Sequence, residues 1–147
     1  MKAAMTLNQL LLVTALIFGG LQFVPVERTN PPVQSAMVAP QPVTNLLRRA
    51  CYDCHSNETV WPWYGKVAPF SWLVAKDVNA GREKLNFSNW NRLSLREQEQ
   101  KKIEIWQRIK SGDMPPPFYI LGHPDGRVST DHHALLRNWS GVDSRRK

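Results

Sequence analysis

Five consecutive residues, Cys51-Tyr52-Asp53-Cys54-His55, constrain this chain more than any other feature of its sequence. Two cysteines three positions apart on one helical turn face the same side, so both sulfurs reach the vinyl-derived carbons on one edge of a single haem. The histidine that follows is placed to become the proximal ligand of the iron. The pattern predicts covalent attachment of a c-type haem through Cys51 and Cys54, with His55 coordinating the metal.

The same cysteines would also suit a redox dithiol or half of a zinc site. A thioredoxin-type dithiol follows a strand in a βαβ unit, whereas the text around this motif indicates short helices and loops rich in tryptophan and proline. A zinc site needs two further ligands, but His132 and His133 are adjacent, unlike the spaced pair of a zinc finger, and the chain has only 2 cysteines. Both alternatives lack their usual context, which favours haem.

Length and composition indicate one compact domain with a terminal appendage, since the chain has 147 residues. Its 11 prolines and 8 glycines predict short helices and long loops. The net charge is +7, but the basic residues are spread along the chain, and the one tight basic cluster is Arg145-Arg146-Lys147. We therefore expect no nucleic-acid partner; a basic surface would instead favour acidic redox partner proteins by steering their encounter.

Residues 1–26 are expected to meet a membrane, because an apolar run covers residues 10–26. About 17 residues is the lower limit for a spanning helix and slightly long for the core of a signal peptide. No small-x-small cleavage site closes the run, so an uncleaved anchor is preferred over a cleaved signal segment. Lys2 precedes the run without a nearby acidic residue, which predicts that the haem motif lies outside the cytoplasmic membrane.

The rest of the chain divides into three parts. Residues 27–42 contain four prolines and no apolar periodicity, which predicts an extended tether that is either free or packed onto the domain. Residues 43–142 are the predicted haem-binding domain, and residues 143–147 are a basic tail.

Four helical patterns fill the predicted domain. They are the segment from Val43 through the motif, residues 71–86, the segment between Ser94 and Gly112, and the segment between Ser129 and Gly141. In the second helix Ser71 is the expected cap and Gly81 a weak point. Ser94 and Glu97 fit a capping box at the start of the third helix. The fourth helix is expected to pack across the first beside the haem edge, with His132 and His133 at the surface.

The sixth iron ligand is predicted in the sequence Asp113-Met114-Pro115-Pro116-Pro117. A methionine just past a helix end, followed by prolines that fix an extended chain, is delivered from a stiff loop. Its thioether would stabilise the reduced iron relative to a second imidazole. The alternatives are a buried gap-filling methionine, His123 as ligand from a neighbouring loop, and an open or water-bound position.

Other candidates concern the walls of the haem pocket. Trp61, Trp63, Tyr64 and Phe70 lie in a loop ordered by prolines and glycine, where they either line the haem face or form ordinary core. Arg82 either reaches a haem propionate or is a solvated residue of its helix.

The quoted motifs resemble two related groups of proteins. The order of helix, CxxCH, loop, helices, Met-Pro-Pro and a terminal helix resembles class I c-type cytochromes. More specifically, CYDCHSNET, WPWY, APFSW, LNFS and SGDMPPP are similar to the bacterial haem-binding domain family of small, often membrane-anchored monohaem proteins, over about residues 30–140. The resemblance implies His55 and Met114 as iron ligands. One departure is STDHHALL, with histidines where an acidic residue is usual, which would weaken the cap of the last helix.

The sequence as a whole predicts an all-α, small class I cytochrome c-like domain around one covalently attached haem c, preceded by an N-terminal hydrophobic segment. We expect it to pass single electrons on the periplasmic side of the bacterial inner membrane. Because no acid–base pair or activated nucleophile is evident, we do not expect an enzyme. The alternative is a haem-based sensor or small-ligand-binding module whose sixth ligand is displaceable or absent.

Overall fold

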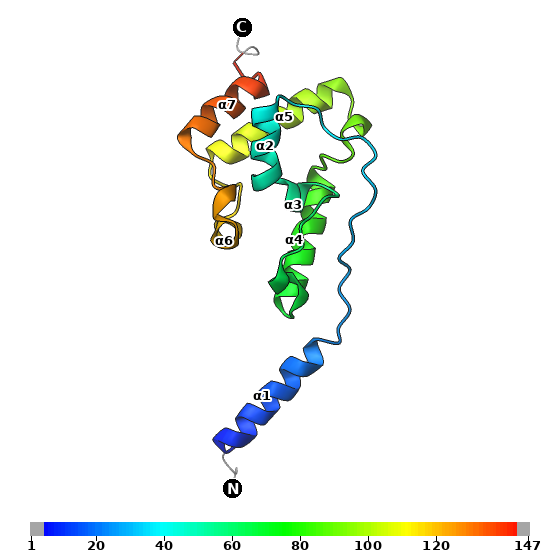
Figure 1. Cartoon of the computed structure of the whole chain (residues 1–147), viewed down its shortest axis with the longest axis vertical. Helices are drawn as coiled ribbons and strands as arrows, with labels where there is room; N and C mark the ends of the chain where they lie inside the picture. The colour runs from blue at the N-terminus through cyan, green and yellow to red at the C-terminus, as the bar shows by residue number, and fades with distance from the viewer. Residues whose placement is uncertain (1–4, 144–147) are drawn as a thin grey trace. The chain divides into compact units, whose positions relative to one another are not determined.

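The computed structural model describes residues 5–143 of the chain, and these residues form an all-α structure without a β-strand. Lys2 and the basic residues after 143 lie outside the described range. The predicted all-α class is confirmed, whereas the cytochrome c-like arrangement stays a prediction. Figure 1 shows the α-helices, which are α1 (Leu7–Leu21), α2 (Gln41–Ala50), α3 (Tyr52–His55), α4 (Phe70–Lys84), α5 (Leu95–Lys110), α6 (Pro117–Gly122) and α7 (Thr130–Ser140). Short 3₁₀ turns occur at Trp63–Lys66, Trp90–Arg92 and Pro124–Gly126.

The chain forms two compact units. Unit 1 contains the described residues up to Thr29 together with Trp61–Asp77, and unit 2 contains Asn30–Val60 together with the described residues from Val78 onward. The division falls within α4, so the second half of that helix belongs to the unit that carries the haem motif.

In unit 1, α1 is an apolar helix whose side chains are not buried. Thr6 and Gln9 cap its first turn reciprocally, with the Thr6 amide 2.9 Å from Gln9 Oε1. The predicted apolar run of residues 10–26 is helical only as far as Leu21. Among residues 5–143, none of the helices combines the length and the apolar character needed to cross a membrane.

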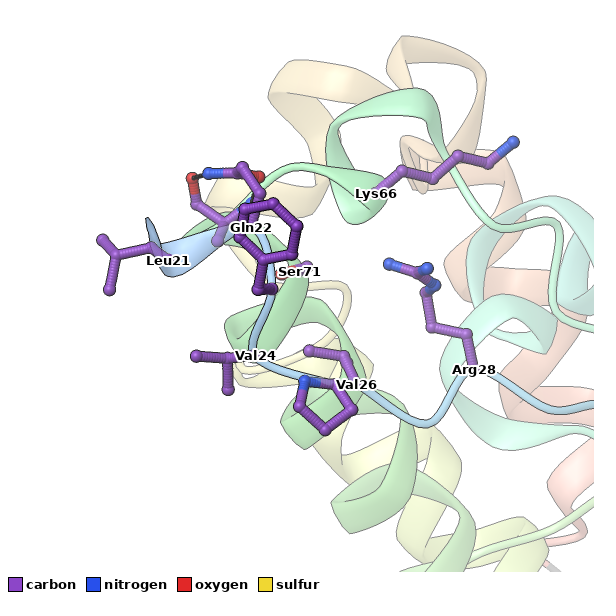
Figure 2. A pocket seen from close by; sticks show the side chains of 10 residues that line it. Leu21, Gln22, Val24, Val26, Arg28, Lys66 and Ser71 are labelled. Carbon is purple, nitrogen blue, oxygen red and sulfur yellow. Dashed lines mark hydrogen bonds between the residues drawn. The ribbon is translucent and has the colours of Figure 1, made fainter. Parts of the chain in front are cut away.

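The segment after α1 is fastened to the loop of residues 61–69. The Gln22 side chain accepts from the Ala68 amide at 2.9 Å and donates to its carbonyl at 3.3 Å. Arg28 donates to the Gly65 carbonyl at 2.9 Å. A cavity of about 270 Å³ lies between these segments, and Arg28 and Lys66 are among the residues that line it (Figure 2). The ten residues that line it include none of the predicted haem ligands.

The core of unit 2 is built by α2, α5 and α7 (Figure 1). Apolar residues recur at helical spacing on each of these helices, and the largest fully buried ones include Leu46, Leu47 and Leu136. The last helix packs against α5 and, less extensively, against α2. The predicted packing of the last helix on the first is therefore present, but α5 is the larger partner.

The segment expected as a tether packs onto unit 2 from residue 30 onward. Met37 is only 5% exposed, and its amide donates to the Phe87 carbonyl at 2.9 Å. Ser35 forms an isolated bridge with Asn89. Proline-fixed extended backbone thus contributes core, because every second side chain of an extended segment faces the domain it lies on.

The helix ends test several predictions. The Ser94 and Glu97 capping box is confirmed, and Gly112 follows α5 with a φ of +79°, which favours glycine. The expected cap at Ser71 is wrong, since its amide donates to the Val67 carbonyl at 2.9 Å inside the first turn of α4.

The histidines of α7 also differ from expectation. They are half-buried rather than at the surface. The Ser129 amide lies 3.1 Å from His132 Nδ1, so this histidine performs the capping role expected of an acidic residue. His133 packs edge-on against Trp106, with ring centroids 5.7 Å apart. The capping box is therefore present with an imidazole nitrogen in place of a carboxylate, and the predicted weakening of the cap stays a prediction.

Candidate haem site

The haem-attachment turn, residues 51–55, begins at a break between two helices. The first helix was expected to continue through the motif, but α2 ends at Ala50 and Cys51 has φ −134° and ψ −31°. The amides of Cys54 and His55 then donate to the Cys51 carbonyl at 3.2 and 2.9 Å. Because the break turns Tyr52 into the core, this single turn presents both thiols and the imidazole.

The buried aromatic rings of Tyr52 and Phe87 pack against each other beneath this turn. Their rings stack with centroids 5.0 Å apart, and both side chains are buried. Phe87 also meets the His55 ring edge-on at 6.4 Å, while its amide donates to the His55 carbonyl at 2.8 Å. Phe87 carries no local sequence signal for a place in the site, because its contacts with Tyr52 and His55 join residues far apart in the chain.

The His55 ring is oriented by the end of α4. Its Nδ1 lies 3.0 Å from the Gly81 carbonyl and 3.2 Å from the Leu85 carbonyl. Two acceptors at one nitrogen assign the hydrogen to Nδ1 and leave the lone pair on Nε2. Burial lowers the pKa of His55, so the ring is neutral. A neutral imidazole fixed through Nδ1 is the usual state of a metal-ligating histidine.

Gly81 lets α4 approach the haem-attachment turn. A Cβ built on it would lie 3.0 Å from the Cys54 carbonyl carbon and 3.1 Å from Cys54 Cβ, with the carbonyl oxygen closer still. The glycine is therefore required by close packing rather than being a weak point of the helix. This contact brings the Gly81 carbonyl to the His55 ring.

Arg82 holds the loop that follows the motif. Its Nε donates to the Ser56 carbonyl at 2.8 Å, and its Nη2 donates to Thr59 Oγ1 at 2.8 Å and to Asn30 Oδ1 at 2.9 Å. The expectation of a solvated arginine is wrong, because a half-buried guanidinium with fixed acceptors contributes order to this loop. Its contact with a propionate stays a prediction.

Cys51 and Cys54 are not joined in a disulfide. Burial, with a smaller contribution from neighbouring Cys54, raises the pKa of Cys51 to about 12. Cys51 is thus a protonated thiol at neutral pH. Two thiols on one turn beside a neutral imidazole with an available Nε2 are the donor set that a covalently held haem requires, so the residues present fit the group.

Asp53, between the cysteines, is the least expected member of the site. Its Oδ1 accepts from the Val60 amide at 2.9 Å, and its Oδ2 accepts from the Tyr119 hydroxyl at 2.8 Å. His123 Nε2 lies 3.9 Å from the same Oδ2. The only sequence signal was an acidic residue inside the motif, because its partners on α6 and after it are more than sixty residues away.

The two candidates for the sixth position lie at different places in the loops around α6. Met114 follows α5, and its residue is 38% exposed, so it is not a buried gap-filling methionine. His123 stacks on Tyr119 with ring centroids 4.2 Å apart, and its Nδ1 lies 3.1 Å from the Tyr119 carbonyl. The structure thus brings Cys51 and His55 together on one turn and places Met114 on a separate loop.

The loop aromatics belong to unit 1. Trp63 is 77% exposed and Phe70 56% exposed, so ordinary core packing is wrong for these two. Trp63 packs edge-on against Tyr64 at 5.9 Å. Within residues 5–143, histidine, cysteine and acidic residues form no group of three or more that is placed to hold a metal ion, so the zinc alternative gains no support.

The sequence profile of the family described as "Haem-binding domain" matches residues 16–141. The chain belongs to this family. Comparisons with curated proteins and with solved structures gave no match. The resemblance drawn from the motifs is thereby confirmed, and haem is the cofactor that this haem-binding domain is built to bind.

Proposed function

We propose that this haem-binding domain is a monohaem c-type cytochrome-like protein that holds one haem c covalently and transfers single electrons. One observation carries the proposal: the turn that presents both thiols also presents an imidazole whose Nδ1 is fixed by two carbonyls of the α4 end. That arrangement supplies attachment and axial ligation from five consecutive residues.

The thiols of Cys51 and Cys54 would attach the group. Each thiol would add across one vinyl group of the haem, its sulfur forming a thioether bond to one vinyl carbon and its hydrogen going to the other. The addition would need no oxidant and would consume thiols, in agreement with two cysteines that are not joined in a disulfide. His55 would hold the iron through Nε2, and Met114 on its loop would be the second protein ligand.

The bound haem supplies the one-electron iron couple. The protein supplies the environment of that couple. His55 stays neutral because it is buried, and the floor formed by Tyr52 and Phe87 excludes water from its side of the site. The proposal assigns no catalytic residue.

We place the domain on the periplasmic side of the inner membrane, where the N-terminal segment anchors it or, if cleaved, leaves it soluble. The exposed leucines of α1 support a lipid contact, because soluble surfaces rarely leave so much contiguous apolar area uncovered. The net charge of +7 supports acidic redox partner proteins.

A second candidate function is a haem-based sensor that binds a small ligand at the sixth position. The observation in its favour is the exposure of Met114 on a loop, because a solvent-accessible ligand is more readily displaced. Tight binding of carbon monoxide with release of methionine would favour the sensor, whereas a stable methionine–iron bond in both oxidation states favours the electron carrier.

The proposal is tested by producing the full chain together with a cytochrome c maturation system. We expect a pyridine haemochrome spectrum of the c type and an intact mass equal to polypeptide plus one haem. A colourless product with the mass of bare polypeptide would refute covalent attachment. A reversible one-electron potential, measured on the same sample, tests electron transfer.

A further inference from the structure

Helix α6 is tied to the haem-attachment turn through the side chain of Tyr119. The Tyr119 hydroxyl donates to Asp53 Oδ2 at 2.8 Å and lies 3.2 Å from the Arg49 carbonyl at the end of α2. The ring is closely packed as well, since a Cβ on Gly126 would come within 3.0 Å of Tyr119 Cε1. Tyr119 is therefore fixed by both its hydroxyl and its ring.

The acceptor of this hydrogen bond is itself fixed. Asp53 sits between the two cysteines, and its other carboxylate oxygen accepts from the Val60 amide at 2.9 Å. Each oxygen thus has its own donor. A hydrogen bond to a charged carboxylate in a partly buried place is among the stronger ones in proteins.

The N-terminal end of α6 is joined by a short segment to Met114, the proposed sixth ligand. Three prolines separate Met114 from Phe118, and the third of them opens α6. At its other end the loop is held to α5, because the Met114 amide donates to the Arg108 carbonyl at 3.2 Å. Proline-fixed backbone transmits the position of one end to the other, since it has few conformations available.

We propose that Tyr119, through its hydrogen bond to Asp53, is a positioning residue that sets the place of Met114 relative to the haem-attachment turn. The inference deepens the proposed function and rests on it. Tyr119 does not touch the iron. Because Tyr119 already restricts the loop, the loop loses less conformational entropy when the Met114 thioether binds the iron. The thioether therefore dissociates more slowly.

The test uses Tyr119→Phe in the haem-loaded full chain, which keeps the stacked ring and removes only the hydroxyl. The measurement is the rate at which added imidazole displaces the methionine, followed through the loss of the near-infrared sulfur-to-iron band of the oxidised protein. We expect displacement about ten-fold faster than in the unmodified protein, the ratio that loss of one charge-assisted hydrogen bond supplies.

The control for general destabilisation is Ser94→Ala, which removes the capping box of α5 away from this contact. Its displacement rate should equal that of the unmodified protein, although its unfolding midpoint falls. Asp53→Asn leaves one acceptor oxygen for two donors and no charge, so its displacement rate should lie between that of the unmodified protein and that of Asp53→Ala, which should match Tyr119→Phe. The double variant Asp53→Ala, Tyr119→Phe should be no faster than either single variant.

The outcomes separate the two claims. If the unmodified protein lacks the sulfur band, methionine is not the ligand and both the ligand assignment and this inference fail. If the band is present but Tyr119→Phe displaces no faster than Ser94→Ala, the inference fails while the proposed function stands. The inference is supported if displacement is faster in Tyr119→Phe and in Asp53→Ala but not in Ser94→Ala.

Discussion

The haem-attachment turn and the Met114 loop deliver ligands in opposite ways. On the turn, three donor groups lie within five residues, and α4 packs directly over them through Gly81. On the loop, one donor stands on proline-fixed backbone, 38% exposed, and its position depends on side chains beyond the loop. The positions of the donors on the turn thus follow from the spacing of residues in the sequence, whereas the position of Met114 depends on tertiary contacts.

The largest effect is expected from removing the covalent links of the turn. Cys51→Ser with Cys54→Ser should abolish covalent haem, because a hydroxyl does not form the thioether bond. Intact mass and the pyridine haemochrome spectrum measure this. Full retention of covalent haem would contradict the attachment role of the two cysteines and remove the turn from the comparison.

The next effect tests the close approach of α4. Gly81→Ala should lower the free energy of unfolding by about 2 kcal/mol, since the new methyl group overlaps the Cys54 carbonyl. Chemical denaturation of the haem-free protein provides the measurement. Gly19→Ala in α1 is the matched control, because a Cβ there meets nothing within 4 Å. Equal stability of the two variants would show that α4 is not closely seated.

A smaller effect is expected on the loop side. Met114→His should lower the reduction potential on the order of 0.1 V, because imidazole stabilises oxidised iron more than a thioether does. Redox titration measures the change. Met37→Leu is the control, since Met37 is buried in the core and should leave the potential unchanged. An unaltered potential in Met114→His would remove Met114 from the coordination sphere.

The smallest effect is confined to a helix end. Ser94→Ala should cost about 1 kcal/mol of stability by removing the confirmed capping box of α5. The potential should not change, because the cap lies at the far end of that helix from the Met114 loop. A shifted reduction potential would show that the position of Met114 depends on the stability of α5 along its whole length. The Met114 loop would then differ even more from the turn, whose donors are positioned locally.

Local signals in the sequence predicted the local features of the structure. The capping residues of α5 and the glycine after it were correctly located because each acts on neighbours within a few positions. The spacing of Cys51, Cys54 and His55 was likewise sufficient to predict one turn with three donors. The break at Cys51 was not predicted, because it depends on Tyr52 packing against Phe87.

Contacts between distant segments account for what the sequence did not reveal. The prolines around Met37 leave open whether that segment is free or packed onto the domain, and in the structure Met37 is part of the core. Gly81 resembled a helix defect because its partner, Cys54, is distant in the sequence. The tie between Asp53 and Tyr119 left no periodic signal at all. In each case the deciding interaction joins residues whose closeness only the folded chain defines.

The carbonyls that hold His55 are that of Gly81, which also accepts from the Leu85 amide at 2.9 Å, and that of Leu85, just past the end of α4, where a helix lacks internal donors. The imidazole is therefore the C-terminal cap of that helix. The negative end of the helix dipole faces its N–H and makes the ring a stronger electron donor. In the proposed cytochrome, this field favours ferric iron while a thioether favours ferrous iron. The working voltage of the protein would then reflect the balance between a helix end and a methionine.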